Sequence, residues 1–235
     1  MWVPKNGFAG LTSRQHLPKP VIAAVNGYAM DGGCEIAVAC HLIVADTTAT
    51  FALSEVRVGL IAGAGGLVRL PRLPRAIPSK LATEMILTGR RLTAEEALHH
   101  GLVNRVSDAG TALDGALALA EEILAGSPTS VRASLQVMDE TAGIPDTVDA
   151  IRHQSPALDA LLVSQDMVEG LAAFAQKGHP TGHETEHEGI RSGRSWVTGA
   201  VESVAALDTS AGPPGLAGGG LSGRQRTPEG SRRPV

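Results

Sequence analysis

The sequence predicts an α/β fold in the first part of the chain and an all-α region after it. Two observations support this prediction. An apolar run of strand length at residues 21–25 is followed by glycines and an Ala-rich helical run, and the same order returns at residues 50–53 and 59–70. Beyond residue 110, helix-capping residues and apolar side chains at helical spacing replace the strand-like runs.

Length and composition limit the kind of protein. Of the 235 residues, 43% are hydrophobic but only 3% are aromatic, so the core must consist mainly of Ala, Val, Leu and Ile. The net charge of −4, with no basic patch among aromatics, argues against a nucleic-acid partner. No uncharged apolar run approaches the length of a bilayer span, and Cys34 and Cys40 fit neither a zinc site nor a disulfide framework. We therefore expect no membrane partner, and a cytoplasmic location.

The chain divides into three predicted segments. Residues 1–110 carry the α/β part, residues 111–182 form a helical region, and residues 183–235, rich in Gly, Pro and Arg, are expected to be disordered. Residues 196–207 have weak helical character at best. The predicted strands are residues 21–25, 42–46, 50–53 and 102–106, and the predicted helices include 78–88, 93–100, 111–124, 127–137, 146–163 and 165–177.

Two details of these helices can be tested directly. Thr93 begins a capping box, and Thr111 repeats the same signal at the start of the next helix. In that next helix a stripe of apolar residues is expected to face the core or another subunit. The stripe consists of Leu113, Leu117, Ala120 and Leu124.

Residues 28–35 are the most informative for function. Gly32 and Gly33 precede a helix, and the free N–H groups of a first helical turn can bind negative charge, while glycine lets a ligand approach the backbone. Glu35 lies within that first turn, and no Lys, Ser or Thr is placed to meet phosphate or magnesium. This pattern predicts a site for a small developing charge beside a carboxylate, although a glutamate here is often only a favourable partner of the helix dipole.

Several motifs in the right order and spacing carry a family resemblance. Between about Gly7 and Lys177, the chain resembles the enoyl-CoA hydratase/isomerase (crotonase) family. The motifs are Lys19-Pro20-Val21-Ile22-Ala23-Ala24-Val25-Asn26-Gly27, Gly32-Gly33-Cys34-Glu35, Ser54-Glu55-Val56, Gly63-Ala64-Gly65-Gly66, Leu87-Thr88-Gly89-Arg90 and Gly101-Leu102-Val103.

The resemblance implies a crotonase-like spiral of strand-strand-helix turns, followed by a helical region that builds a homotrimer or hexamer. It implies an acyl-CoA thioester substrate and no separate cofactor, because CoA is carried by the substrate. Glu35 and Glu55 match the two catalytic glutamates of the hydratases, and the N–H of Gly32 matches one donor of the oxyanion hole.

Three further positions have two interpretations each. The resemblance places Gly63 near the substrate, or Gly63 only turns the chain. It places Phe174 and Lys177 on a terminal helix that helps to hold the CoA nucleotide, or they are an ordinary amphipathic helix end. No metal is expected: the spacing of His179, His183 and His187 superficially suggests ligands, but Pro180 and Gly182 interrupt the helix that such ligands need.

The sequence also departs from the family pattern. Family members carry several spiral strands before the Lys19-Pro20 motif, including the loop that supplies the second oxyanion donor, so we expect an N-terminally truncated member. Asp31 stands where a small residue is usual, and it is predicted to cap the helix through the N–H groups of residues 33 and 34. The leading function is hydration of a 2-enoyl-CoA. The alternatives are double-bond isomerisation or another CoA-thioester reaction, and a catalytically silent family member.

Overall fold

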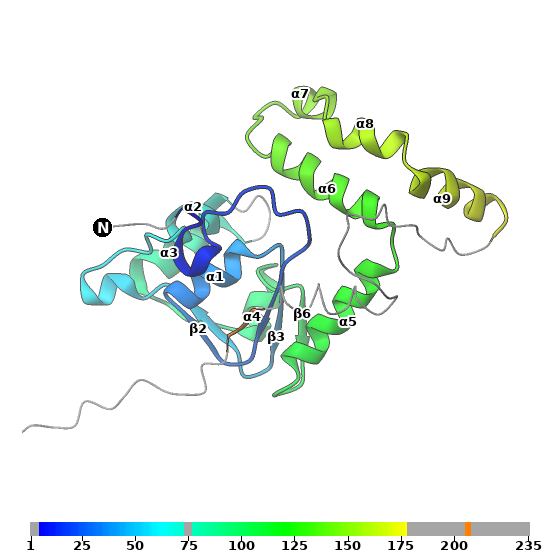
Figure 1. Ribbon diagram of the computed structural model, residues 1–235. Coiled ribbons are helices and arrows are strands. Elements are labelled where there is room, and N and C mark those ends of the chain that lie inside the picture. The colour runs from blue at the N-terminus through cyan, green and yellow to red at the C-terminus, as the bar shows by residue number, and fades with distance from the viewer. Residues whose placement is uncertain (1–4, 73–76, 178–204, 208–235) are drawn as a thin grey trace, which may run out of the picture.

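The computed structural model describes residues 5–72, 77–177 and 205–207 (Figure 1). The strands are β1 (Ile22–Val25), β2 (Tyr28–Met30), β3 (Leu42–Asp46), β4 (Thr50–Ala52), β5 (Leu92–Thr93), β6 (Arg105–Ser107) and β7 (Ala205–Leu207). The α-helices are α1 (Gly32–Ala39), α2 (Gly66–Arg72), α3 (Ser79–Thr88), α4 (Ala94–His99), α5 (Ala112–Leu124), α6 (Pro128–Thr141), α7 (Thr147–Arg152), α8 (Pro156–Leu162) and α9 (Gln165–Ala175). Two short 3-10 helices are η1 (Phe8–Gly10) and η2 (Glu55–Val58).

Successive strand-strand-helix units stack on one another. β1, β2 and α1 form one unit, and β3, β4 and α2 form the next. β1 pairs in parallel with β3, and β2 pairs in parallel with β4, so each strand lies beside its counterpart in the other unit. The two sheets have the orders β6-β3-β1-β7 and β2-β4-β5. This confirms the predicted α/β fold with a crotonase-like spiral.

The strands β1 and β3 are buried on both faces. Ala23 and Val25 point into the larger core cluster with α1, α3 and α4, whereas Ile22 and Ala24 point into a second cluster against α5. A parallel strand covered on both faces needs a continuous apolar run rather than an alternating one. This explains why residues 21–25 and 42–46 were recognisable in the sequence. Phe51 is the single aromatic residue among the buried hydrophobic residues that the structure describes.

Most predicted helix ends are confirmed. Thr93 and Glu96 form the predicted capping box of α4, and Ser127 accepts from the Ser130 N–H at the start of α6. The prediction for Thr111 was wrong, because its hydroxyl donates to the carbonyl oxygen of Asp108 and does not cap α5. The long helix predicted at residues 146–163 is two helices, α7 and α8, separated at residues 153–155.

The apolar stripe predicted on α5 is confirmed in part. Ala120 is buried and Leu117 and Leu124 are half-buried, whereas Leu113 is exposed. The buried residues of α5 also include Ala112, Ala116 and Leu119. Small residues allow the helix to approach the sheet closely: a Cβ added at Gly115 would lie 3.1 Å from Cγ1 of Val44 on β3. Close packing on the sheet therefore favours small residues on this face of α5.

Three short strands were not predicted. β2 and β5 have three and two residues, too few to show a sequence pattern. β7 lies within the segment predicted to be disordered, where residues 196–207 showed weak helical character at best. It is a strand that pairs in parallel with β1, with Ala205 opposite Ala23 and Leu207 opposite Val25. The remainder of residues 183–235 lies outside the described residues. Strand β6 begins three residues later than the strand predicted at 102–106.

The helices after α5 form an arm beside the α/β part. In Figure 1, α6, α7, α8 and α9 lie together at the upper right, away from α1, α2 and α3. α6 packs against α8 and α9. In the part of the chain that the structure describes, none of the helices combines the length and apolar character needed to cross a bilayer.

A buried carboxylate at the end of β3 accepts hydrogen bonds from two neighbouring segments. Asp46 is 1% exposed; its Oδ1 accepts from the N–H and hydroxyl of Thr48, at 2.8 and 2.6 Å, and its Oδ2 accepts from the Gly110 N–H at 2.8 Å. Burial raises the pKa of Asp46, but these hydrogen bonds outweigh it and leave the pKa below its ordinary value. The ionised form is therefore the one that stabilises the fold.

We predict that Asp46→Asn lowers the free energy of unfolding at pH 7 by about 2 kcal/mol, because the amide NH₂ would face the Gly110 N–H. The difference in the free energy of unfolding between wild type and variant should be constant at pH values above the ordinary aspartate pKa. It should become smaller as the pH falls through the lower pKa that Asp46 has in the folded state. Urea unfolding at several pH values measures this. Exposed Asp108→Asn is the matched control, and an equal loss in both variants would contradict the role of Asp46.

Candidate functional site

The predicted catalytic residues lie where the two spiral units meet. Gly32 is the first residue of α1, and Glu35 lies in the first turn of the same helix. Glu55 is the first residue of η2, which follows β4, and β4 pairs with β2, the strand just before α1. The parallel pairing of β2 and β4 therefore carries Gly32, Glu35 and Glu55 to neighbouring positions.

Glu35 is held by a backbone donor from the second unit. Its side chain is buried, with 3% exposed, and Oε1 accepts from the Gly66 N–H at 2.8 Å. Gly66 begins α2, so this bond joins the first turn of α1 to the first turn of the next helix. One carboxylate oxygen is thereby fixed in place. Gly66 belongs to the glycine motif at residues 63–66, of which the sequence predicted a site role only for Gly63. The contact of Gly66 with Glu35 has no sequence signal, because the two residues are brought together only by the fold.

Glu55 lies in an environment that favours its protonated form. Burial raises its pKa, and the nearby carboxyl groups of Asp31 and Glu35 raise it further, while its own backbone N–H acts in the opposite direction. Two carboxyl groups in different surroundings are the usual means by which one site supplies both a base and an acid. Glu55 is thus suited to give a proton.

Asp31 does not cap α1 with its side chain, contrary to the prediction. Its Oδ1 instead accepts from the N–H and from the hydroxyl of Ser54, each at 2.7 Å. The Asp31 N–H donates to the carbonyl oxygen of Ala52 at 2.9 Å. Its φ of 52° and ψ of −121° lie in a region that glycine tolerates and that costs other residues on the order of 1–3 kcal/mol of strain. Asp31 therefore joins the start of α1 to the residues immediately before Glu55.

The Gly32 backbone is covered by an aromatic ring. A Cβ at position 32 would lie only 2.7 Å from Cε1 of Phe8, so glycine is required for the ring to sit here. As the first residue of α1, Gly32 has an N–H without an acceptor inside the helix. Phe8 was not foreseen, because a single aromatic residue in an irregular segment carries no sequence signal.

The other predicted binding residues, Gly63, Phe174 and Lys177, are all exposed. Gly63 is exposed in the loop between η2 and α2, and its N–H donates to the carbonyl oxygen of Ile61 at 2.7 Å. Phe174, 84% exposed, lies on α9, and exposed Lys177 follows that helix with a φ of 54°. The helix α9 packs on α6 and α8 within the arm.

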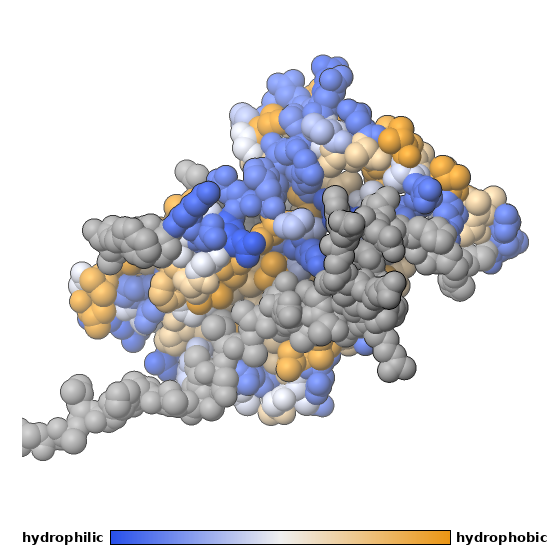
Figure 2. Space-filling model, in the orientation of Figure 1, coloured by the Kyte–Doolittle hydropathy of each residue, from blue (hydrophilic) through white to orange (hydrophobic). Residues whose placement is uncertain are grey.

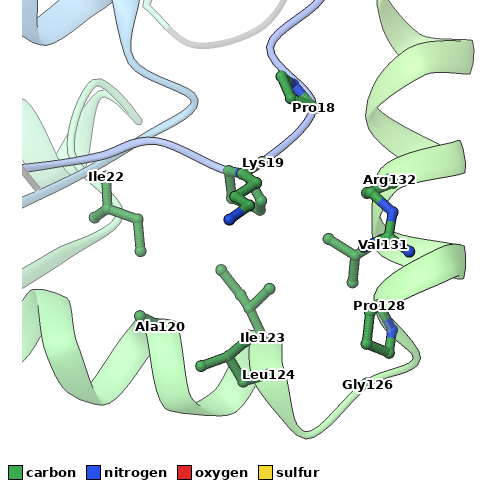
Figure 3. A pocket seen from close by; sticks show the side chains of 11 residues that line it. Pro18, Lys19, Ile22, Ala120, Ile123, Leu124, Gly126, Pro128, Val131 and Arg132 are labelled. Carbon is green, nitrogen blue, oxygen red and sulfur yellow. The ribbon is translucent and has the colours of Figure 1, made fainter. Parts of the chain in front are cut away.

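A separate pocket lies between the start of β1 and the elbow that joins α5 to α6 (Figure 3). It encloses about 670 Å³ of space not filled by protein, part of it open to solvent. Its lining is mainly aliphatic and proline side chains, with Lys19 and Arg132 as its charged residues. None of the predicted catalytic or binding residues lines it, so this pocket is distinct from the glutamate site.

The cysteines have no nucleophilic setting, as predicted. Burial raises the pKa of Cys34 to about 12 and that of Cys40 to about 11, so both thiols stay protonated near neutral pH. Among the described residues no group of three or more His, Cys, Asp or Glu side chains is arranged to hold a metal ion. His179, His183 and His187 lie outside those residues.

Comparison with known proteins gives consistent matches. The family model described as enoyl-CoA hydratase/isomerase matches residues 3–184. Carnitinyl-CoA dehydratase of Citrobacter koseri is 42% identical over 177 residues, which are 74% of this chain and 67% of that protein. The carnitinyl-CoA dehydratase of Escherichia coli K12 is similar to the same extent over 178 residues.

Solved structures match in the same way. The crystal structure of enoyl-CoA hydratase from Mycobacterium tuberculosis H37Rv superposes with a TM-score of 0.71 at 43% identity, over 78% of this chain and 70% of that one. The enoyl-CoA hydratase from Mycobacterium marinum gives a TM-score of 0.71 at 42% identity, over 77% and 72% of the two chains.

The contact between Gly66 and Glu35 leads to a prediction about stability. A Cβ at position 66 would lie 2.9 Å from Cβ of Ala62, 3.0 Å from Cδ1 of Leu53 and 3.2 Å from Cγ of Glu35. We expect Gly66→Ala to lower the free energy of unfolding by about 1–3 kcal/mol through overpacking.

Gly63→Ala, in the loop that precedes α2, is the matched control. Its Cβ would meet only Ile61, at 3.7 Å or more, so its effect should stay within about 0.5 kcal/mol. Chemical denaturation of the two variants and the wild type measures both effects. Equal stabilities of the two variants would show that position 66 is not tightly packed.

Proposed function

We propose that this chain, which belongs to the enoyl-CoA hydratase/isomerase (crotonase) family and stands among its lyases, adds water across the 2,3-double bond of an acyl-CoA thioester. The observation that carries the proposal is the pair of glutamates at the start of α1 and η2. Glu35 is fixed by the Gly66 N–H, and Glu55 lies in surroundings that favour its protonated form.

Hydration needs a base, an acid and a donor for developing negative charge. In this proposal Glu35 takes a proton from a water molecule whose oxygen bonds to C3 of the enoyl group. The electron pair of the double bond moves towards the thioester, and the N–H of Gly32 donates to the oxygen on which negative charge grows. Glu55 then gives its proton to C2.

The two glutamates end the turnover with their protonation states exchanged. Glu35 holds the proton taken from water, and Glu55 has lost its own. Exchange with solvent restores the starting state. In the reverse direction the same groups remove water, because a reaction and its reverse pass through the same transition state. The relatives named carnitinyl-CoA dehydratase and enoyl-CoA hydratase are described by these two directions of one type of reaction. The reaction requires no cofactor besides the CoA of the substrate.

We predict that Glu35→Gln and Glu55→Gln each lower kcat for hydration of crotonyl-CoA by about 10²–10⁴-fold, because each removes one proton transfer. Loss of the enoyl thioester absorbance measures the rate. In Glu35→Gln the amide oxygen of the new side chain can still accept from the Gly66 N–H, so the fold around it should persist. Glu122→Gln is the control, since Glu122 is an exposed residue of α5 paired with Arg105.

The outcomes separate the alternatives. Full activity in both variants would overturn the proposed mechanism. Dependence on Glu55 alone, with movement of the double bond instead of its hydration, would favour an isomerase. Binding of CoA esters with no turnover by the wild type would indicate a catalytically silent member.

We also propose that the helical arm packs against further copies of this chain in a trimer or hexamer. Large apolar side chains lie exposed along it, and Figure 2 shows hydrophobic surface over these outer helices. Ile151 is 78% exposed, Val163 85% and Phe174 84%. So many exposed apolar side chains on neighbouring helices are typical of an interface.

Light scattering should therefore give a mass three or six times the 24.2 kDa of one chain for the wild type. Val163→Lys should shift the mass towards that of one chain, because a charge buried in an apolar contact is costly. Val58→Lys, at a residue of η2 that is 74% exposed, is the control and should leave the assembly intact. A monomeric wild type would contradict this proposal.

A further inference from the structure

The pocket beside the α5–α6 elbow, here called the elbow pocket, has apolar walls from three separate elements. Ile22 comes from the start of β1, Ile123 from the last turn of α5 and Val131 from the first turn of α6. Figure 3 shows these side chains around one common space. Sites for small molecules are usually lined by apolar side chains with a few polar groups that fix the orientation of the ligand. The elbow pocket has such a lining.

Two cations lie at this apolar space without a carboxylate partner. Lys19 and Arg132 line the elbow pocket, and the described residues that line it include no acidic residue. Within residues 5–72, 77–177 and 205–207, neither cation forms an ion pair. Arg132 is half-buried, and the hydrogen bond that its Nη2 donates to the hydroxyl oxygen of Thr129 is long, at 3.4 Å. A guanidinium has five N–H donors, so this contact leaves donors for an anion.

The segments that carry both cations are held in place. Lys19 has a proline on each side, which restricts its backbone to extended conformations. At the start of α6, the buried carboxylate of Asp166 accepts from the hydroxyl of Ser127 at 2.8 Å and from the Thr129 N–H at 3.2 Å. These contacts fix the turn of α6 that precedes Arg132. A pocket that is already formed costs a ligand less ordering on binding.

A second hollow adjoins the elbow pocket on the side of α8. The two share Pro18 and Arg132, and the second hollow is lined in addition by the polar side chains of His16, Thr129 and Gln136. Arg132 therefore lies between an apolar space and a more polar one. This is the position in which the charged end of an amphipathic ligand would be held.

We propose that the elbow pocket binds a medium-chain carboxylate. Its alkyl chain lies between Ile22, Ile123 and Val131, and its carboxylate accepts hydrogen bonds from Arg132, with Lys19 as the second cation. The planar guanidinium matches the two oxygens of a carboxylate. Such a ligand touches both the α/β part and the helical arm, so its binding stabilises the position of α6 beside β1. The inference does not rest on the proposed function, because neither Glu35 nor Glu55 lines this pocket.

Calorimetric titration of the full chain with saturated carboxylates from hexanoate to hexadecanoate, each below its micelle concentration, tests the apolar part. We expect saturable binding of one carboxylate per chain. Affinity should rise by about two- to fourfold for each added methylene and level off once the alkyl chain fills the pocket. Decyltrimethylammonium, with the chain of decanoate and the opposite charge, should bind at least about tenfold more weakly. No saturable binding, or a rise in affinity that never levels off, would overturn the proposal.

Charge variants test where the carboxylate lies. Arg132→Gln should weaken decanoate binding by about 10–100-fold, because it removes a charged hydrogen-bond donor at a half-buried position. Lys19→Gln should weaken it by no more than about fivefold, since Lys19 is exposed. Arg152→Gln, at an exposed residue of α7 outside the pocket, changes the net charge equally and is the matched control. Equal affinities of the Arg132 and Arg152 variants would contradict the assigned position.

Methyl NMR of the wild type locates the bound chain and does not depend on turnover. Decanoate should shift the signals of Ile22, Ile123 and Val131 and leave those of Ile151 and Val163, which are exposed on the arm, unchanged. Shifts confined to the arm residues would show binding to exposed apolar surface and overturn the site. Displacement of decanoate by crotonyl-CoA would also overturn it, because the pocket would then belong to the thioester site. Binding of decanoate by a chain that does not hydrate crotonyl-CoA would refute the proposed function alone.

Discussion

The in-register pairing of β1 with β3 and of β2 with β4 is the constraint on which the rest of the molecule depends. Both pairs of parallel strands are connected through α1, and α2 follows β4, so the pairing also fixes where each helix begins. A slip of one residue would exchange the side chains that β1 presents to the two core clusters. It would also separate Asp31 from Ser54 and Glu35 from Gly66, which are the contacts that hold the glutamate site.

The two glutamates of the site lie in different surroundings. Glu35 receives a backbone N–H in a buried position, whereas Glu55 shares its surroundings with Asp31 and Glu35. The difference in roles thus arises from neighbours and not from residue type. Asp31 combines a strained backbone with two hydrogen bonds that its carboxyl group accepts from Ser54.

Sequence alone was sufficient where one residue or one run determines the local structure. The apolar run 21–25 predicted a strand because that strand is buried on both faces, and Thr93 predicted a helix start because its cap is local. It failed where the partner is distant in sequence. The contact of Asp31 with Ser54 and the pairing of β7 with β1 depend on the stacked units, and the alanine face of α5 was hidden by more hydrophobic leucines.

The stacked arrangement has a consequence for how the chain folds. The pairs β1–β3 and β2–β4 join units that follow one another along the sequence, so these contacts close short loops. The pairing of β7 with β1 is different, because it joins Ala205 to Ala23 across nearly the whole chain. Such a distant contact is slow to form. The pairing that closes this edge of β1 therefore has the highest loop-closure entropy cost among the described strand pairs.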